Sequence, residues 1–437
     1  MRIKTKHNLG SHLTIDGFYC SKEKLDDEKL IKKIMNELPD KLGMKKLNEP
    51  VVIRHTPKIK EERGITAFIV IAESHISLHT YPEKGYLSAD IFSCREFDIE
   101  FALNYFKEQF EIKKLEKNIV KRGHSETLDE SELRKVKGFN VNKVKNSKDL
   151  VEQFRYLGFQ ATHLARAAEV IKRMKKDKAT VILTFTSNMV SSGLRELFAE
   201  LVKRKFVDVI ITSVGSIEED LMKSEKSFLL GSFNADDKEL HKKGINRIGN
   251  IFVPNDRYML LEDQLIPFFT KLHQKQKETG KMISPSELIH ELGKTIKDEN
   301  SIIYWAAKNN IPIFCPAILD GALGLQVYFF KQKHPDFGID VTADMKQLAN
   351  IVLTADKTGG IILGGGTAKH YAIGVNILRE GFDYTVYVTT ASQYDGSLSG
   401  ARPNEAVSWS KIKEEANTVT VDGDATIIFP IIMSAVL

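Results

Sequence analysis

The feature that most constrains the fold is an alternation of short β-rich runs with amphipathic helical patterns over the C-terminal part of the chain. The β-rich runs read TVILTFT, VDVIITS, IPIFCPAI, GGIILGG and DYTVYVTT, and helical patterns such as SGLRELFAELVKRK and AKHYAIGVNILREG lie between them. Strands separated by helices indicate βαβ units, in which a parallel sheet is covered on both faces. Residues 138–437 are therefore predicted to form one large, doubly wound α/β domain of the Rossmann-like kind.

The first 121 residues show a different pattern. Strand-like stretches at 66–72 and 86–93 mix with helix-like stretches at 26–38 and 97–110, which predicts a two-layer α+β domain over residues 1–121. The run EIKKLEKNIVKRGHSETLDESELRKVKG follows, and it is charged and nearly without aromatic side chains. Residues 122–137 are therefore predicted to be a solvated connector, with a long exposed helix inside one domain as the alternative.

Composition excludes several classes of protein. Apolar residues make up 42% of the chain and charged residues 28%, which is typical of a globular protein. The net charge is only +5, too small to indicate a nucleic-acid partner. The N-terminal residues lack the apolar core of a signal peptide and no apolar run suits a membrane span, so a soluble, cytoplasmic protein is expected. The three cysteines, Cys20, Cys94 and Cys315, lie far apart and predict neither a disulfide framework nor a zinc site, and no metal site is predicted.

A first set of candidate catalytic residues lies in IAESHISLHTYPEKGYLSADIFSC, which starts at Ile71. The pattern predicts a strand, a turn and a second strand, in which Ser74, His79 and Cys94 could converge. A serine with a nearby histidine is a weak signal, because the geometry of a nucleophile is spatial rather than sequential. The alternative makes His79 a buried strand histidine and Cys94 a small apolar residue.

The motifs GSHLTIDGFYC and ESHISLHTYPE strengthen this interpretation, because over about residues 8–120 the chain resembles the prokaryotic S-adenosylmethionine decarboxylase family. The resemblance implies that the chain cleaves itself between Glu73 and Ser74, and that Ser74 becomes a pyruvoyl group. It also implies that His79 acts in this processing and that Cys94 is the general acid of decarboxylation. The pyruvoyl ketone would form a Schiff base with the substrate amine and accept electrons as CO2 leaves.

The substrate of this domain depends on the segment VVIRHTPKIKEERGITAF. A site for S-adenosylmethionine is expected to stack the adenine on an aromatic ring, yet this segment has no aromatic residue before Phe68. Glu61 and Glu62 could instead hold a second amino group or a guanidinium, which favours ornithine or arginine as the substrate. The alternative is a solvated charged loop, with the adenine stacked on a ring from elsewhere.

Residues 138–437 resemble deoxyhypusine synthase, on motifs that read FTSNMVSSGLRE, IITSVGSIEEDL, GINRIGNIFVPN, PAILDGALG, GGIILGGGTAKHYA, YDGSLSGARPNEAVSWSKI and VDGDATIIFP. The resemblance implies that NAD oxidises spermidine and that an aminobutyl fragment forms an imine with a lysine before it passes to an acceptor amine. It assigns that lysine to Lys411 and the base or polar partner to His370. Glu405 and Trp409 would hold the polyamine through a carboxylate and a cation–π contact, and Tyr387 would also line the pocket.

The same resemblance assigns the NAD contacts to Ser187, Ser191, Ser213, Glu219, Asp320, Gly366, Thr390, Asp395, Ser399 and Asp424. Independently of the family, three glycines at 364–366 between a strand and a helix could cradle a phosphate. The place of Lys411 is harder to derive. On a continuous helix it would lie about 240° round from Glu405, so only the resemblance or a break in the helix puts both in one pocket.

Three positions depart from the family pattern. Leu325 and Leu398 stand where the family carries acidic polyamine anchors, and Gly374 replaces a pocket asparagine. A buried ammonium without a carboxylate partner is costly. Spermidine in its usual pose is therefore expected to bind poorly.

Together these features predict a bifunctional enzyme of polyamine biosynthesis. A pyruvoyl-dependent decarboxylase would make putrescine or agmatine, and an NAD-dependent aminobutyl transferase would act on a small amine, as in homospermidine formation. One alternative is S-adenosylmethionine decarboxylation together with modification of a lysine on the hypusine-bearing translation initiation factor. Another is a catalytically silent second domain that serves as a scaffold. Both resemblances imply a homo-oligomer, a tetramer of second domains with paired decarboxylase domains, and no nucleic-acid or membrane partner is expected.

Overall fold

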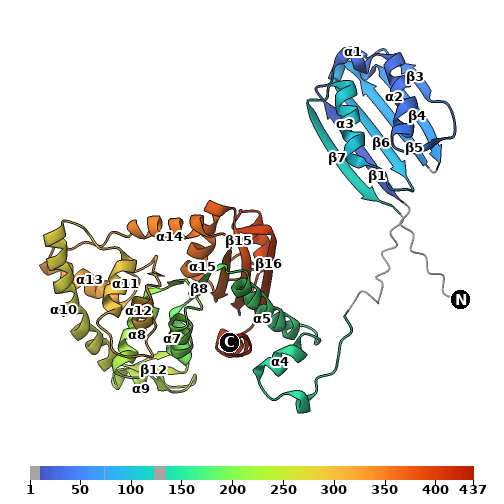
Figure 1. The fold of residues 1–437 in the computed structure, drawn as a ribbon. Helices are drawn as coiled ribbons and strands as arrows, with labels where there is room; N and C mark the ends of the chain where they lie inside the picture. Colours follow the sequence, from blue (N-terminus) through green and yellow to red (C-terminus); the bar gives the residue numbers. More distant parts are fainter. Residues whose placement is uncertain (1–9, 73, 123–133) are drawn as a thin grey trace. The chain divides into compact units, whose positions relative to one another are not determined.

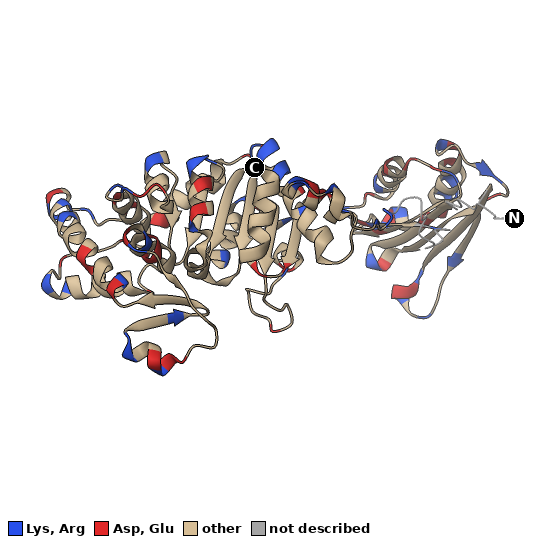
Figure 2. Ribbon diagram, turned by 90° about the horizontal axis from the view of Figure 1, so that it is seen from below, with Lys and Arg blue, Asp and Glu red and all other residues tan. Residues whose placement is uncertain are grey.

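The computed structural model describes residues 10–72, 74–122 and 134–437, and the chain divides into two compact units, Met1–Leu133 and Arg134–Leu437 (Figure 1). The connector predicted at 122–137 spans this division, and its residues 123–133 lie outside the described part of the chain. Within the described ranges, no helix combines the length and the apolar composition needed to cross a membrane. Both acidic and basic residues occur on helices of each unit (Figure 2).

The first unit is a seven-stranded antiparallel sheet in the order β2-β4-β5-β6-β1-β7, with β3 paired to β4. Its strands are β1 (Ser11–Phe18), β2 (Lys45–Lys46), β3 (Val51–His55), β4 (Gly64–Ala72), β5 (Ser74–Tyr81), β6 (Tyr86–Ser93) and β7 (Lys114–Lys121). Its helices are α1 (Lys22–Leu25), α2 (Glu28–Lys41) and α3 (Ile99–Phe110), with short 3-10 turns η1 (Lys60–Glu62) and η2 (Pro82–Lys84). The two-layer α+β prediction agrees with this arrangement.

Among the described residues of this unit, helices pack against one face of the sheet. Side chains alternate between the two faces of a strand, and Ile76 and Leu78 of β5 are fully buried in the core with α2 and α3. The opposite side remains accessible, and Phe68 of β4 is 39% exposed there. We call this side the open face, and its residues in the centre of the sheet are His12, Phe68, His75, Ser77, His79, Asp90 and Phe92.

The second unit is built on a six-stranded sheet in the order β13-β9-β8-β14-β15-β16, in which every neighbouring pair is parallel. The strands are β8 (Thr180–Phe185), β9 (Val209–Thr212), β13 (Ile313–Phe314), β14 (Thr358–Leu363), β15 (Phe382–Thr389) and β16 (Ile412–Asp422). The five β-rich runs of the sequence correspond to the first five of these strands. A continuous helix through Lys411 does not form, because the residues that follow it belong to the edge strand β16. Its charged run of Lys413, Glu414 and Glu415 is compatible with an edge position, where one side of the strand meets solvent.

Helices cover both faces of this sheet. Val181, Leu183 and Phe185 of β8 pack into one core cluster, whereas Ile182 packs into a second cluster with Ile211 and other residues on the opposite face. The helices are α4 (Ser147–Phe154), α5 (Gln160–Lys176), α6 (Ser187–Met189), α7 (Arg195–Lys203), α8 (Val214–Glu225), α9 (Asp237–Lys242), α10 (Asp256–Thr279), α11 (Pro285–Gly293), α12 (Ile302–Asn309), α13 (Ala322–Lys333), α14 (Ala343–Thr354), α15 (Gly366–Val375), α16 (Pro403–Val407) and α17 (Ala425–Val436). Shorter turns are η3 (Val141–Lys143), η4 (Val190–Leu194) and η5 (Asn376–Arg379), and β10 (Leu229–Leu230), β11 (Ile245–Ile248) and β12 (Ile251–Pro254) form a small antiparallel sheet.

A buried ion pair holds α8 in place beside the sheet. Asp220 of α8 is completely buried and accepts a hydrogen bond of 2.5 Å from Nε of Arg195 on α7. It also accepts from the hydroxyl of Ser301 and the backbone N–H of Ile303, each at 2.9 Å. Because one carboxylate joins α7, α8 and the start of α12, the residues on either side of Asp220 are rigidly placed.

Candidate active sites

The first candidate site lies where β5 begins and β6 ends. Ser74 is paired in register with Ser93, the last residue of β6, and Cys94 follows Ser93 directly. The antiparallel pairing therefore brings Ser74 and Cys94 to the same end of the sheet, as the sequence predicted. Glu73, on the other side of the expected cleavage point, lies outside the described residues.

The structure separates His79 from Ser74 within one chain. His79 lies five residues further along β5, so at a rise of about 3.3 Å per residue the two Cα atoms are about 16 Å apart. Strand alternation also places His79 on the open face, whereas Ser74 belongs to the set that faces the helices. The predicted convergence of Ser74, Cys94 and His79 is therefore wrong for a single chain, because five residues of an extended strand cannot fold back.

The surroundings of His79 lie at the other end of the sheet. Its Nδ1 is 3.1 Å from the hydroxyl oxygen of Thr66, its cross-strand partner in β4. Glu61 and Glu62 lie in η1, just before β4 begins, and both are exposed. Since β4 starts at Gly64 and ends beside Ser74, these carboxylates are close to the His79 end and far from Ser74 of the same chain.

A polar cluster that the sequence reasoning missed lies next to Ser74. Nδ1 of His75 is 3.5 Å from the Ser74 hydroxyl, and Nε2 of His75 is 3.5 Å from Oδ1 of Asp90. Asp90 also interacts with Nε2 of His12 at 3.0 Å and accepts a hydrogen bond from the Ser77 hydroxyl. Partial burial would raise the pKa of Asp90, but the hydrogen bonds from Ser77 and His12 hold it below its usual range. The alternation of His75 and Ser77 with buried residues could have predicted one shared face, but not the neighbouring strands.

The second unit gathers the predicted NAD contacts at one edge of its parallel sheet. Each of them follows the carboxyl end of a strand: Ser187 and Ser191 follow β8, Ser213 and Glu219 follow β9, Asp320 follows β13, Gly366 follows β14, Thr390, Asp395 and Ser399 follow β15, and Asp424 follows β16. In open α/β sheets ligands bind outside the carboxyl ends of the strands. The topology thus places all ten residues where a ligand site is expected.

Several of these residues contact one another. The backbone N–H of Ser187 donates to the Ser213 hydroxyl at 3.2 Å, and the N–H of Gly366 donates to the Ser399 hydroxyl at 3.1 Å. The hydroxyl of Ser191 donates to Glu219 at 2.5 Å. Burial raises the pKa of Glu219 to about 8, so this carboxyl carries its proton at neutral pH.

Close to this edge, a pocket of about 280 Å³ brings together the residues assigned to polyamine chemistry. Those that line it are His370, Tyr387, Glu405, Trp409 and Lys411. The sequence pattern alone did not place Lys411 with the others. The five predicted substrate and catalytic residues of this unit are therefore neighbours in space.

A break in the helix explains the position of Lys411. Helix α16 ends at Val407, and Ser410 has a left-handed backbone with φ of 54°. The N–H of Lys411 then bonds to the carbonyl of Ala406 at 3.0 Å, and β16 begins at the next residue. Nζ of Lys411 lies 5.0 Å from the centre of the Trp409 ring. Because the chain reverses here, the 240° offset of a continuous helix does not apply.

The pocket also contains groups that the sequence reasoning did not single out. Lys369 is only 1% exposed, its Nζ donates to the carbonyl of Ala401 at 2.8 Å, and it lies 4.4 Å from the centre of the Tyr387 ring. Burial lowers the pKa of Lys369 to about 8. The Tyr387 hydroxyl is buried and has no hydrogen-bond partner among the described residues. Adjacency to His370 was the only signal for Lys369, since a lysine on a helix is usually solvated.

The positions that depart from the family pattern are not equivalent. Leu398 lines the pocket and presents an apolar side chain to it. Leu325 lies on α13 with 57% of its surface exposed and does not line the pocket of its own chain. Gly374 faces open space, since a Cβ built there meets no atom within 4 Å.

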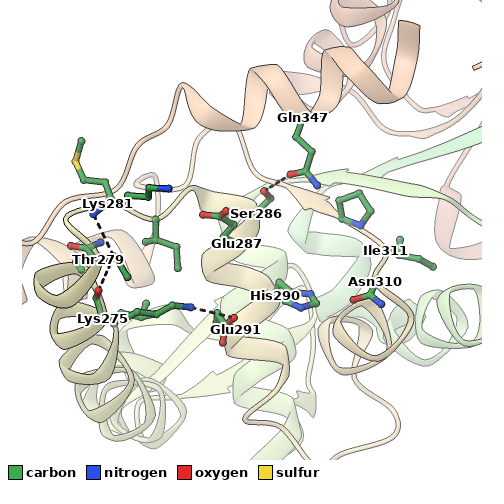
Figure 3. A pocket seen from close by; sticks show the side chains of 15 residues that line it. Lys275, Thr279, Lys281, Ser286, Glu287, His290, Glu291, Asn310, Ile311 and Gln347 are labelled. Atoms are coloured by element: carbon green, nitrogen blue, oxygen red, sulfur yellow. Dashed lines mark hydrogen bonds and ion pairs between the residues drawn. The ribbon is translucent and has the colours of Figure 1, made fainter. Parts of the chain in front are cut away.

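A separate pocket of about 460 Å³ lies between α10, α11 and the residues that precede β13 (Figure 3). Figure 3 shows Lys275 reaching across to Glu291, with a distance of 3.9 Å between their charged atoms, while Ser286 donates to Gln347 at 3.1 Å. This pocket is at the amino end of β13, opposite the edge that carries the predicted NAD contacts. It includes no site residue predicted from the sequence.

Comparison with known proteins gives a match for each unit. The deoxyhypusine synthase family model matches residues 149–436, and the S-adenosylmethionine decarboxylase family model matches residues 11–123. A probable deoxyhypusine synthase of Thermococcus onnurineus is 48% identical over 315 residues, which cover 69% of this chain and 94% of the relative. One from Methanocaldococcus jannaschii is 50% identical over 295 residues, covering 64% and 89%. A solved structure titled as that of a putative deoxyhypusine synthase from Entamoeba histolytica is 26% identical, covers 69% of this chain and 96% of its own, and has a TM-score of 0.49.

The raised pKa of Glu219 predicts a pH-dependent effect of Glu219→Gln. The folded chain keeps a proton on Glu219 up to about pH 8, whereas the unfolded chain loses it near pH 4.3, so stability of the natural chain falls across that window. Glutamine cannot ionise and still accepts from Ser191. The free energy of unfolding of the variant is therefore expected to exceed that of the natural chain, by a difference that grows from about pH 5 to about pH 8.

Urea unfolding followed by circular dichroism at pH 5, 7 and 9 measures this margin. Glu278→Gln, on the exposed side of α10, is the matched control and should show no such trend. A margin for Glu219→Gln that stays constant with pH would contradict the raised pKa.

Proposed function

The chain belongs to the deoxyhypusine synthase family over residues 149–436 and carries a domain of the S-adenosylmethionine decarboxylase family over residues 11–123, and on this premise we propose that it is a bifunctional enzyme of polyamine biosynthesis. The first unit cleaves itself before Ser74, acquires a pyruvoyl group and decarboxylates ornithine or arginine. The second unit transfers an aminobutyl group from the resulting amine to a small acceptor amine with the help of NAD, as in homospermidine formation. The observation that carries this proposal is the pocket shared by His370, Tyr387, Glu405, Trp409 and Lys411.

The charges in that pocket favour a short donor. Of the described residues that line it, Glu405 is the only carboxylate, while Lys369, Arg402 and Lys411 are basic. Arg402 is neutralised by Asp422, with 2.7 Å between their charged atoms. A diamine such as putrescine has one ammonium left for Glu405 when its other amine reacts. A longer polyamine would place further positive charge beside Leu398 and the lysines, which is unfavourable.

The pocket residues have separate tasks in this reaction. Lys411 is the amine that carries the aminobutyl fragment, and His370 takes up or returns a proton at the reacting amine. The buried hydroxyl of Tyr387 lacks a partner, so a substrate amine can satisfy it at little cost. Trp409 presents an aromatic face beside Lys411 that also suits an alkylammonium chain.

The carboxyl edge of the parallel sheet fits a dinucleotide, in keeping with a Rossmann-like relationship. NAD, when bound, supplies the hydride acceptor. Gly364 and Gly366 have positive φ of 78° and 64°, and a Cβ on Gly366 would project into open space at the start of α15, so the backbone there is accessible to a phosphate. The remaining contacts proposed for NAD are Ser187, Ser191, Ser213, Glu219, Asp320, Thr390, Asp395, Ser399 and Asp424.

The decarboxylase site is proposed to be shared by two copies of the chain. The open face exposes apolar side chains, with Ile53 59% exposed and Phe68 39% exposed, and such a surface favours association. If two open faces pack with their strands in opposite directions, the partner's His79 comes to the end of the sheet where Ser74 and Cys94 lie. Glu61 and Glu62 of the partner would come to the same place, where they could hold the cationic group of ornithine or arginine.

The second units are proposed to associate as well. Leu325, Tyr328 and Phe329 form an exposed apolar surface on α13, each with more than half of its surface accessible in the single chain. A homotetramer of second units with paired first units would cover both kinds of surface. Leu325, which is remote from the pocket of its own chain, would then lie at a contact between copies.

A second candidate function is favoured by the names of the archaeal relatives. They are called probable deoxyhypusine synthases, and they share 48% to 50% identity with this chain. In that case the acceptor is a lysine of the hypusine-bearing translation factor, and the first unit acts on S-adenosylmethionine. The two functions differ in both the decarboxylase substrate and the acceptor, so each can be assayed.

The first prediction from this proposed function concerns the decarboxylase substrate. Purified protein, with cleavage before Ser74 checked by intact mass, is expected to release CO2 from carboxyl-labelled ornithine or arginine and not from labelled S-adenosylmethionine. Ser74→Ala should stay uncleaved and release nothing. Release from S-adenosylmethionine alone would reject the small-amine route and favour the second candidate.

The second prediction concerns Lys411. Lys411→Ala should lower NAD-dependent aminobutyl transfer from putrescine about a thousandfold or more, because the group that carries the fragment is gone, and should leave CO2 release unchanged. Products are identified by mass spectrometry. Lys413→Ala is the matched control, since Lys413 pairs with Asp383 at 2.7 Å outside the pocket. Unchanged transfer by Lys411→Ala would exclude this catalytic role and support a scaffold function.

The third prediction tests the shared decarboxylase site. Ser74→Ala and His79→Ala chains expressed separately should both stay uncleaved. When the two are co-expressed with different tags, the His79→Ala chain should be cleaved, because the partner's His79 is intact. Absence of cleavage in the mixed population, or efficient cleavage of His79→Ala alone, would contradict the sharing of His79 between copies.

A further inference from the structure

We propose that His75 is the base that takes the hydroxyl proton of Ser74 during self-cleavage, and that Asp90 positions its ring for this step. The inference rests on the self-cleavage proposed above, and it assigns a role to a residue that the sequence reasoning left without one. Ser74, His75 and Asp90 form a continuous chain of polar contacts at one end of the sheet.

The distances define the order of this chain. The Ser74 hydroxyl is 3.5 Å from Nδ1 of His75, and the other ring nitrogen, Nε2, is 3.5 Å from Oδ1 of Asp90. A nucleophile, a base and a carboxylate that orients the base are the general arrangement for activating a hydroxyl group. Contacts of this kind are often long before the reacting geometry is reached. Both distances are close enough for a hydrogen bond to form with a small movement of the ring.

The carboxylate determines which nitrogen can accept the proton. An ionised Asp90 can only accept hydrogen bonds, so it favours the tautomer of His75 with the proton on Nε2. Nδ1 then carries the free lone pair, and it is the nitrogen that faces Ser74. The hydrogen bonds from His12 and Ser77 favour the ionised form of Asp90, whose pKa is held low.

The ring of His75 is held by its neighbours on the open face. It stacks on Phe68 with 5.3 Å between ring centres and an interplanar angle of 25°. The edge of Phe92 lies against it at 6.1 Å between centres. These contacts come from β4 and β6, on either side of β5, so they limit rotation of the ring away from Ser74.

His75 provides a base next to Ser74, which His79 of the same chain cannot provide. His79 is about 16 Å from Ser74 along β5, whereas His75 is the adjacent residue. The first proton transfer of self-cleavage therefore needs no residue from a partner. In this proposal a second copy of the chain is required only for the part of self-cleavage in which His79 acts.

The proposed step is balanced without an added reactant. Oγ of Ser74 bonds to the carbonyl carbon of residue 73 while its proton passes to Nδ1 of His75. The bond from that carbon to the nitrogen of residue 74 then breaks, and the proton moves from His75 to the departing amine. The result is an ester and a free amine, an isomer of the original peptide.

The same groups also lie close enough together to hold a cation. One ligand atom each from His12, His75 and Asp90 lies within 4.8 Å of the others. However, both oxygens of Asp90 already accept hydrogen bonds in the structure. Metal-independent proton transfer is therefore the proposal, and chelation is one arm of the test.

The test follows the precursor during cell-free synthesis, with cleavage measured by gel and intact mass. His75→Asn retains a polar group near Nδ1 but cannot act as a base, and it should cleave about 10²- to 10⁴-fold more slowly than the natural chain. His55→Asn, an exposed histidine on β3, is the matched control and should cleave at the natural rate. Circular dichroism should show that all three chains are folded. A folded His75→Asn chain that cleaves at the natural rate would overturn the proposal.

Three additions make the test specific to proton transfer. Imidazole should restore cleavage to His75→Ala, because His75 is partly accessible to solvent. Hydroxylamine, which cleaves esters, should not cleave His75→Asn, because no ester forms. A metal chelator should leave the natural chain unaffected. Failure of imidazole rescue in a folded chain, hydroxylamine-dependent cleavage of His75→Asn, or arrest by the chelator would each overturn the role of His75.

The positioning role of Asp90 has its own readout. In uncleaved Ser74→Ala protein, nitrogen-15 NMR should find the His75 proton on Nε2, and adding Asp90→Asn should shift it toward Nδ1. Asp90→Asn alone should slow cleavage. An unchanged tautomer would reject this role.

Failure of this inference is distinguishable from failure of the proposed function. If the natural chain is not cleaved before Ser74, the proposed decarboxylase itself fails. If it is cleaved and the His75 variants are cleaved equally fast, only the role of His75 is rejected.

Discussion

Burial of both faces of the parallel sheet is the constraint on which the second unit depends. Strands β8, β9, β14 and β15 are almost entirely buried, because helices cover each side of the sheet, and ligand-binding side chains can therefore be presented only beyond the strand ends. Parallel strands all end at the same edge of the sheet. The ten predicted NAD contacts, of which Ser187 is the first and Asp424 the last, therefore lie at that edge although they are far apart in the sequence. The buried Arg195–Asp220 pair adds rigidity, because it ties the helix that carries Glu219 to its neighbours.

The first unit differs from the second, because its described helices cover one face of the antiparallel sheet and leave the other face accessible. Polar and aromatic side chains can therefore line the open face along the whole length of β5. Strand β5 places His75 beside Ser74 and His79 at the far end of the sheet. Residues of one sequence motif therefore lie at two separate positions. The proposed local base for Ser74 and the proposed contribution of His79 to a partner copy are compatible consequences of one extended strand.

The two proposed activities are linked by the charge of the product. Decarboxylation removes a carboxylate from an amino acid and leaves a short cationic amine. The pocket of the second unit has one carboxylate, Glu405, beside several basic groups, of which Lys369 is deeply buried with its pKa lowered to about 8. A pocket of this kind suits a donor with few positive charges. The apolar side chain of Leu398 in this pocket and the fused domain of the S-adenosylmethionine decarboxylase family both support the proposed class of substrate.

The sequence by itself determined the alternation of strands and helices, the two families, and the residue types that the chemistry needs, because periodicity and motifs are local properties of the chain. Tertiary structure decided which of those residues meet. The left-handed turn at Ser410 places Lys411 beside Trp409, although helical periodicity separated Lys411 from Glu405. The extended strand separates His79 from Ser74, and the pairing of β1, β5 and β6 brings His12 and Asp90 to His75. These outcomes depend on strand order, register and burial, which are set by packing between distant segments and leave little trace in any local stretch of sequence.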